Sequence, residues 1–198
     1  MESLLQTPPV PVSIDSGQIY KDQRTFSIRC HDRFFRDGVL CDDTGNRLFD
    51  CVARNILTSW NLRRHLTDAS GQDLLTIRHY NSSLNRWTIE DMHGRALCRV
   101  KDVSKQGLTT LDAQVCSDSS DTTIHIKSFD AAGTKTSFEV EGIKIAEMTV
   151  TDNNDVSFLG RRGLDRSAWK LEVAGGVDVA LVAAIAFVRV EVMHARRR

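Results

Sequence analysis

Hydrophobic and polar residues alternate along most of the chain between about residues 25 and 151. Phe26, Ile28 and Cys30 are separated by polar residues, and the same period of two recurs in later stretches such as residues 75–77 and 124–126. A period of two is typical of strands that bury one face. The pattern therefore predicts a series of short β-strands.

Short segments with glycine separate the alternating stretches. They are residues 36–38, 43–46, 68–71, 91–94 and 131–133. Glycine permits the positive φ that tight turns need, and Asp or Asn side chains accept hydrogen bonds from the turn backbone. We interpret each segment as a candidate hairpin connection. Strands at this spacing, with no helical period between them, predict an all-β sandwich or barrel.

The pattern changes near the C-terminus, where an apolar run replaces the alternation. Residues 177–188 are apolar apart from Asp178, and Arg189 and Glu191 follow. We predict a helix over about residues 177–194 with Asp178 at its start, although the many valines also suit a strand. Its apolar residues surround the axis, so the helix must be buried in protein or in lipid. The run is shorter than the about 20 apolar residues of a membrane span, which favours a helix enclosed by the sheet.

The composition fits a globular protein of one domain. The chain has 198 residues, of which 41% are hydrophobic and 26% charged. Its three prolines are Pro8, Pro9 and Pro11, so we predict a flexible arm over residues 1–17 and one domain over residues 18–198. The five cysteines are odd in number and show no CxxC spacing. Without a secretory signal, they predict reduced thiols in a cytoplasmic or nuclear protein.

Four stretches carry a resemblance to a known family. They are residues 38–49, residues 66–78 with their Asp-x-x-Gly turn, residues 84–87 ending in a tryptophan, and residues 169–181. In this order, and before the terminal apolar helix, they resemble the LURP-one-related proteins, which share the tubby C-terminal fold with tubby proteins and phospholipid scramblases. The resemblance covers about residues 20–194. It implies a mainly β protein, a closed antiparallel barrel of about twelve strands around the buried C-terminal helix.

Few residues stand out as candidate ligands. Arg161 and Arg162 lie in a loop flanked by glycines, and Arg166 follows. Guanidinium groups bind phosphate through two parallel hydrogen bonds, so this loop is a candidate for an anionic headgroup, with a solvated loop as the alternative. Asp152 and Asp155 offer hard oxygen atoms to calcium. The twelve-residue calcium loop is absent, however, and a polar hairpin turn is the simpler interpretation.

No motif of a common enzyme class occurs in the chain. A Walker A sequence, a dinucleotide-binding glycine motif, a zinc-protease motif and a nucleophile elbow are all missing from the sequence. No histidine stands at zinc-ligand spacing from another histidine or a cysteine. We therefore expect a protein that is not an enzyme and needs neither cofactor nor metal.

The resemblance implies a tubby-like binding module that recognises anionic membrane lipids, such as phosphoinositides, at the cytoplasmic face of a membrane. The alternative is a protein-interaction or signalling scaffold, as suggested for plant relatives linked to defence. Lipid transport of the scramblase kind is the least favoured function. The 26 basic and 26 acidic residues balance, so any membrane affinity needs a local patch. We expect a monomer in the cytoplasm, at the membrane periphery or in the nucleus, with no transmembrane span and no nucleic-acid partner.

Overall fold

The computed structural model describes residues 4–14, 17–30, 37–53, 63–80, 85–105, 107–116, 121–151 and 167–196. These residues contain a run of strands followed by one C-terminal helix. The elements are β1 (Arg24–Cys30), β2 (Asp37–Asp42), β3 (Arg47–Ala53), β4 (Arg63–Asp68), β5 (Asp73–Tyr80), β6 (Arg86–Glu90), β7 (Ala96–Asp102), β8 (Thr110–Cys116), β9 (Asp121–Ser128), β10 (Lys135–Val140), β11 (Ile143–Thr151), β12 (Ser167–Val173) and α1 (Val179–Arg196).

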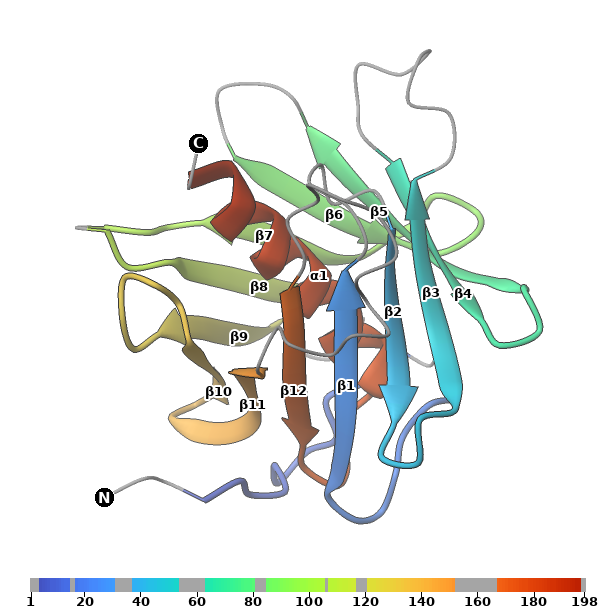
Figure 1. Ribbon diagram of the computed structural model, residues 1–198, viewed down its shortest axis with the longest axis horizontal. Helices are drawn as coiled ribbons and strands as arrows, with labels where there is room; N and C mark the ends of the chain where they lie inside the picture. The colour runs from blue at the N-terminus through green and yellow to red at the C-terminus, as the bar shows by residue number, and fades with distance from the viewer. Residues whose placement is uncertain are drawn as a thin grey trace.

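The twelve strands form one closed antiparallel barrel (Figure 1). Each strand pairs with the next along the chain, and β12 pairs with β1 to close the sheet. Closure gives every strand a hydrogen-bonding neighbour on both sides, which removes the open edges that promote aggregation. The predicted fold class, a mainly β barrel around a C-terminal helix, is confirmed.

The alternating pattern places the apolar side chains inside the barrel. In β1, Phe26, Ile28 and Cys30 are buried, while the residues between them are more exposed. The predicted turns at residues 43–46, 68–71 and 91–94 do connect paired strands. In the second of them, Asp68 Oδ1 accepts hydrogen bonds from the backbone N–H groups of Ser70 at 2.8 Å and Gln72 at 2.9 Å. These bonds satisfy backbone N–H groups that have no partner strand at the turn, and they fix the shape of the turn.

The prediction of a turn at residues 36–38 is wrong for Gly38, which lies within β2. This glycine is needed for packing, because it faces the central helix. A Cβ atom added to Gly38 would lie 2.5 Å from Cε1 of Phe187 in α1. The missing side chain therefore makes room for the phenylalanine ring, a role that a turn signal does not reveal.

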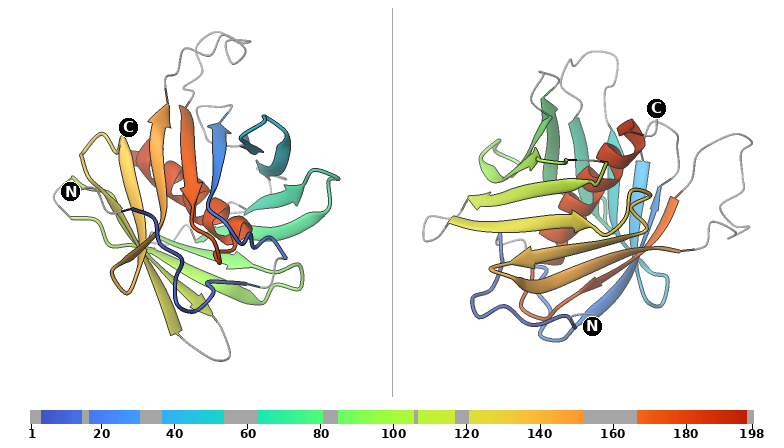
Figure 2. Two further views of the ribbon diagram at one scale, coloured as in Figure 1. Left: turned by 90° about the horizontal axis from the view of Figure 1, so that it is seen from below. Right: turned by 90° about the vertical axis from the view of Figure 1, so that its left-hand side faces the viewer.

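The helix α1 passes through the barrel (Figure 2), as predicted, and its bounds differ by two residues from the predicted 177–194. Residues 179–193 are all buried, Arg189 and Glu191 included. Asp178 caps the helix, since its Oδ1 accepts hydrogen bonds from the N–H groups of Ala180 at 3.0 Å and Leu181 at 3.3 Å. No helix among the described residues is long and apolar enough to cross a bilayer.

The segment before β1 packs across the end of the barrel where α1 begins. Gln6 N donates to Lys144 O at 3.0 Å, and Val12 O accepts from Asp178 N at 2.9 Å. The side chain of Val12 is buried. The sequence suggested a flexible arm over residues 1–17, whereas residues 4–14 are attached to the barrel by these bonds. Proline suits this place, because it fixes φ near an extended conformation and has no N–H group that needs an acceptor.

The carboxylate of Glu191 in α1 is held by three side chains of the barrel wall. Arg64 in β4 forms a buried ion pair with it, and Trp87 Nε1 donates to Glu191 Oε2 at 3.2 Å. His79 Nδ1 lies 3.2 Å from Glu191 Oε1, and the His79 ring stacks on Trp87 with 4.5 Å between centroids. Burial raises the pKa of Glu191, but the charge of Arg64 and the bond to His79 outweigh it and hold that pKa at about 2.

This pKa predicts a specific loss of stability in acid. An unfolded glutamate titrates near pKa 4.3, so the lower folded pKa of about 2 means that ionised Glu191 stabilises the fold above about pH 5. The contribution decreases as the pH falls towards 2. We expect the difference in unfolding free energy between the wild type and a Glu191→Gln variant to be constant above pH 5 and to shrink below it, because protonated glutamate resembles glutamine. Urea titrations at several pH values measure this difference, and a constant gap down to pH 2 would contradict the assignment.

Candidate anion-binding groove

The candidate residues that the sequence suggested all fall in one undescribed stretch. Arg161, Arg162 and Arg166, proposed for an anionic headgroup, and Asp152 and Asp155, proposed for calcium, lie outside the described residues. Both sites therefore stay predictions. In the ranges that the structure does describe, no three His, Cys, Asp or Glu side chains gather as a metal-ligand cluster.

A groove of about 750 Å³ lies on the outer face of the barrel, over β5 to β9. Its lining is rich in polar side chains, which are those of Tyr80, Arg86, Thr88, Arg99, Lys101, Asp112, Gln114 and Thr123. The volume lies within the range of small-molecule sites. The groove therefore offers room for a polar ligand on a surface made entirely of neighbouring strands.

Three cations in this groove are brought together by strand register. Arg86 in β6 is directly opposite Lys101 in β7, and Arg99 stands two residues before Lys101 on the same face. Side chains directly opposite in an antiparallel pair have Cβ atoms about 5 Å apart, and diagonal neighbours about 7 to 8 Å. The three positive groups are thus near enough to contact one phosphate group.

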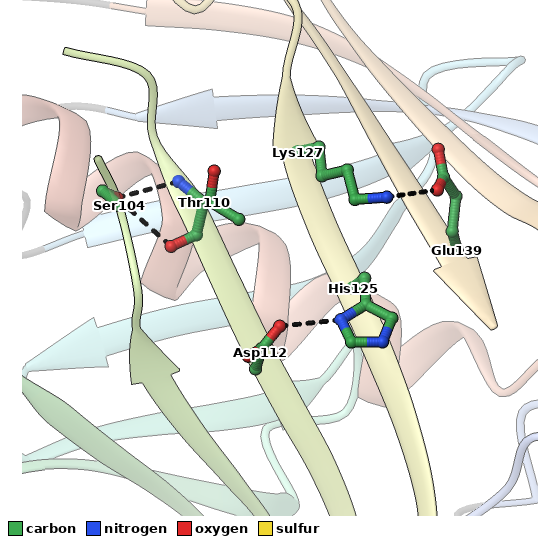
Figure 3. A network of polar contacts seen from close by, with 6 residues as sticks. All are labelled: Ser104, Thr110, Asp112, His125, Lys127 and Glu139. Carbon is green, nitrogen blue, oxygen red and sulfur yellow. Dashed lines mark hydrogen bonds and ion pairs between the residues drawn. The ribbon is translucent and has the colours of Figure 1, made fainter. Parts of the chain in front are cut away.

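These cations differ from three lysines on β9, β10 and β12 in having no carboxylate of the described residues within ion-pair distance. Lys127 forms an ion pair with Glu139 at 2.9 Å (Figure 3), and Lys135 forms one with Glu147 at 3.1 Å. Lys170 forms an ion pair with Glu172, which lies on the same strand, β12. Within the described part of the chain, no acidic side chain forms an ion pair with the three groove cations, which are Arg86, Arg99 and Lys101. Asp112 stands opposite Lys101 in register but pairs with His125, so three cations and one carboxylate leave the groove with positive charge that a ligand could neutralise.

The edge of the groove along β8 and β9 has a different character. Asp112 in β8 is paired with His125 in β9, with 2.7 Å between Oδ1 and Nδ1 (Figure 3). Gln114 and Thr123, opposite each other in the next row, complete this edge. Carboxylate, amide and hydroxyl groups exchange hydrogen bonds with ligand hydroxyls. The site therefore combines a cationic side for phosphate with a hydrogen-bonding side for hydroxyl groups.

The groove is not evident from the sequence, because its cations are not neighbours in the chain. Arg86 is separated from Arg99 by the turn at residues 91–94. The signal was present in the predicted hairpin, since Arg99 and Lys101 are two residues apart and therefore on one face of a strand. The position of Arg86 beside Lys101 depends on the exact register of β6 and β7. A bulge between Ile89 and Glu90 shifts this register.

A comparison with protein families matches residues 24–189 to the family described as LURP-one-related. The chain belongs to the LURP-one-related family. The match extends from the start of β1 into α1, so it includes the groove and most of the central helix. The resemblance found in the sequence is thereby confirmed at the level of the family.

One solved structure of similar fold is a protein from Arabidopsis thaliana. It shares 18% sequence identity with this LURP-one-related chain, and the alignment covers 92% of this chain and 98% of the Arabidopsis chain with a TM-score of 0.66. At this identity the likeness concerns the fold alone. No curated protein matches the sequence.

Proposed function

We propose that the barrel is a non-enzymatic binding module that takes the phosphorylated headgroup of an anionic lipid, such as a phosphoinositide, into the groove. The observation that carries the proposal is the set of three exposed cations on β6 and β7, Arg86, Arg99 and Lys101, without carboxylate partners among the residues described. Guanidinium groups bind phosphate oxygens in a bidentate manner, and a lysine adds a point charge.

The hydrogen-bonding edge of the groove favours a headgroup that carries hydroxyl groups as well as phosphate. Asp112 would repel a second phosphate placed against it, but it can accept a hydrogen bond from a ring hydroxyl. A phosphorylated inositol offers both kinds of group in a molecule that a groove of about 750 Å³ can hold. Anionic lipids are concentrated in the cytoplasmic leaflet, so the proposal places the protein at the cytoplasmic face of a membrane.

The scaffold alternative receives less support. Its support in the sequence was the proline-containing arm together with the lack of an active-site motif, and residues 4–14 of that arm are bonded to the end of the barrel. We therefore favour lipid recognition.

A vesicle-binding experiment tests the groove directly. We expect the wild type to sediment with phosphatidylcholine vesicles that contain a phosphoinositide and not with phosphatidylcholine alone. A triple variant, Arg86→Gln, Arg99→Gln and Lys101→Gln, should bind roughly 100-fold more weakly, because each basic residue near an anionic surface contributes about 1 kcal/mol. Isothermal titration calorimetry with a soluble inositol phosphate should likewise show a weaker affinity for the triple variant than for the wild type.

A second triple variant provides a control with the same change in net charge. Arg47, Arg95 and Lys170 are exposed, lie outside the groove lining, and each pairs with a nearby carboxylate. Their replacement by glutamine should leave both kinds of binding close to wild type. Equal losses of affinity in the two triple variants would show that binding depends on overall charge and not on the groove. A wild type that binds both kinds of vesicle equally would refute the proposal.

A further inference from the structure

Two large apolar side chains are exposed on neighbouring connections at one end of the barrel. Leu108, between β7 and β8, is 40% exposed, and Phe129, directly after β9, is 61% exposed. A backbone hydrogen bond from Ser128 N to Thr109 O, 3.0 Å long, joins the two connections that carry them. Both connections leave the same side of the barrel, on the left in Figure 1.

The turn that carries Phe129 is attached to the core. The guanidinium group of Arg189, fully buried in α1, donates to Ser128 Oγ at 3.1 Å and to Gly133 O at 2.8 Å. Phe129 N itself donates to Lys135 O at 3.0 Å. These bonds hold both ends of the turn, so the ring of Phe129 is presented to solvent by a fixed backbone.

The exposed pair lies at the end of the strands from which the groove cations project. Lys101 is the next-to-last residue of β7, and Leu108 follows in the connection that leaves this strand. Even fully extended, at about 3.3 Å per residue, the four steps from Lys101 to the exposed Lys105 span at most roughly 13 Å. Leu108 N bonds to Lys105 O at 3.2 Å. Phosphate-binding groups and apolar groups can therefore meet a single membrane surface.

The groove cations favour this end of the barrel for contact with an anionic membrane. Lys105 is exposed beside Leu108, and the neighbouring carboxylates of Asp102 and Asp130 accept hydrogen bonds within their own loops. At the other end of β7, Asp42, Asp68 and Asp91 likewise accept hydrogen bonds within their turns, and Arg95 pairs with Asp91. The difference between the two ends is made by Arg86 and Lys101, which lie near the Leu108 end of β6 and β7 and attract an anionic membrane to that side.

We propose that Leu108 and Phe129 form an apolar anchor that inserts into the interface of the anionic membrane whose headgroup occupies the groove. The inference rests on the proposed function, and it adds the orientation of the barrel on the bilayer. Exposed aromatic and leucine side chains beside basic residues partition into the headgroup and acyl boundary, where apolar burial adds to electrostatic attraction. Such an anchor explains why two large apolar side chains are exposed to solvent on connections whose backbone is held by hydrogen bonds.

A tryptophan reporter tests insertion directly. We expect the emission of a Phe129→Trp variant to shift to shorter wavelength on addition of phosphoinositide-containing vesicles, and to be quenched when the acyl chains are brominated. The wild type provides the background from its own tryptophans. The matched control is Met92→Trp, because Met92 is 48% exposed in a turn at the opposite end of β7, and its emission should not change.

A serine double variant measures the contribution of the anchor to affinity. Leu108→Ser with Phe129→Ser should weaken vesicle binding roughly tenfold while leaving the affinity for a soluble inositol phosphate unchanged, and Met92→Ser should change neither. If the wild type binds neither the soluble headgroup nor the vesicles, the proposed function fails and the anchor with it. If the wild type binds both, but the double variant binds vesicles equally well and the reporter at position 129 gives no shift, the anchor alone is refuted.

Discussion

Replacing Glu191 by glutamine is expected to lower the free energy of unfolding by about 3 to 5 kcal/mol. Glu191 is buried within the barrel, and its carboxylate neutralises the equally buried guanidinium group of Arg64. Glutamine keeps the size of the side chain but leaves Arg64 charged and without its counter-ion in a place that excludes water. Urea or guanidinium denaturation measures the loss as a lower midpoint with an unchanged slope.

Two further variants separate the buried charge from other causes. Arg64→Met combined with Glu191→Leu removes both charges at similar volume, so it should recover most of the stability that Glu191→Gln loses. A remaining loss of about 1 kcal/mol is expected, because Trp87 Nε1 no longer has its acceptor. Glu172→Gln breaks a half-exposed pair with Lys170 and should cost no more than about 1 kcal/mol. A Glu191→Gln variant as stable as Glu172→Gln would contradict the argument.

The elements of this fold could be predicted from sequence because their signals are local. The alternation of Phe26, Ile28 and Cys30 needs only a period of two, and an apolar run with Asp178 before it indicates a buried, capped helix without any knowledge of the sheet. The family resemblance then supplied closure of the barrel and the number of strands. Local pattern and family order agreed, which is typical of a sequence that specifies one structure.

The interactions between elements could not be predicted, since they join residues far apart in the chain. Arg64 and Glu191 are separated by 127 positions, and the sequence shows only that Arg64 and its neighbour face opposite sides of a strand. Gly38 has the appearance of a turn glycine until Phe187 is placed beside it. The groove depends in the same way on register, because one residue of slip would send Arg86 to the inner face.

The second large effect is expected at the contact between the central helix and the wall. Phe187 is fully buried in α1, so Phe187→Ala should leave a cavity in the middle of the barrel and lower the free energy of unfolding by about 3 to 5 kcal/mol. Phe129→Ala is the matched control: its ring is 61% exposed, and its loss should change stability by less than about 0.5 kcal/mol. Chemical denaturation of both variants under one condition gives the comparison.

Gly38 provides a test of whether this contact is specific. Gly38→Ala alone would place a methyl group 2.5 Å from the ring of Phe187 and should cost about 1 to 3 kcal/mol through overpacking. In the Phe187→Ala background the same methyl group enters the cavity, so its cost should fall towards zero. The double variant should therefore be more stable than the sum of the two single losses predicts, because residues in direct contact couple. Strict additivity would show that Gly38 and Phe187 do not share this space, and that the helix lies differently against β2.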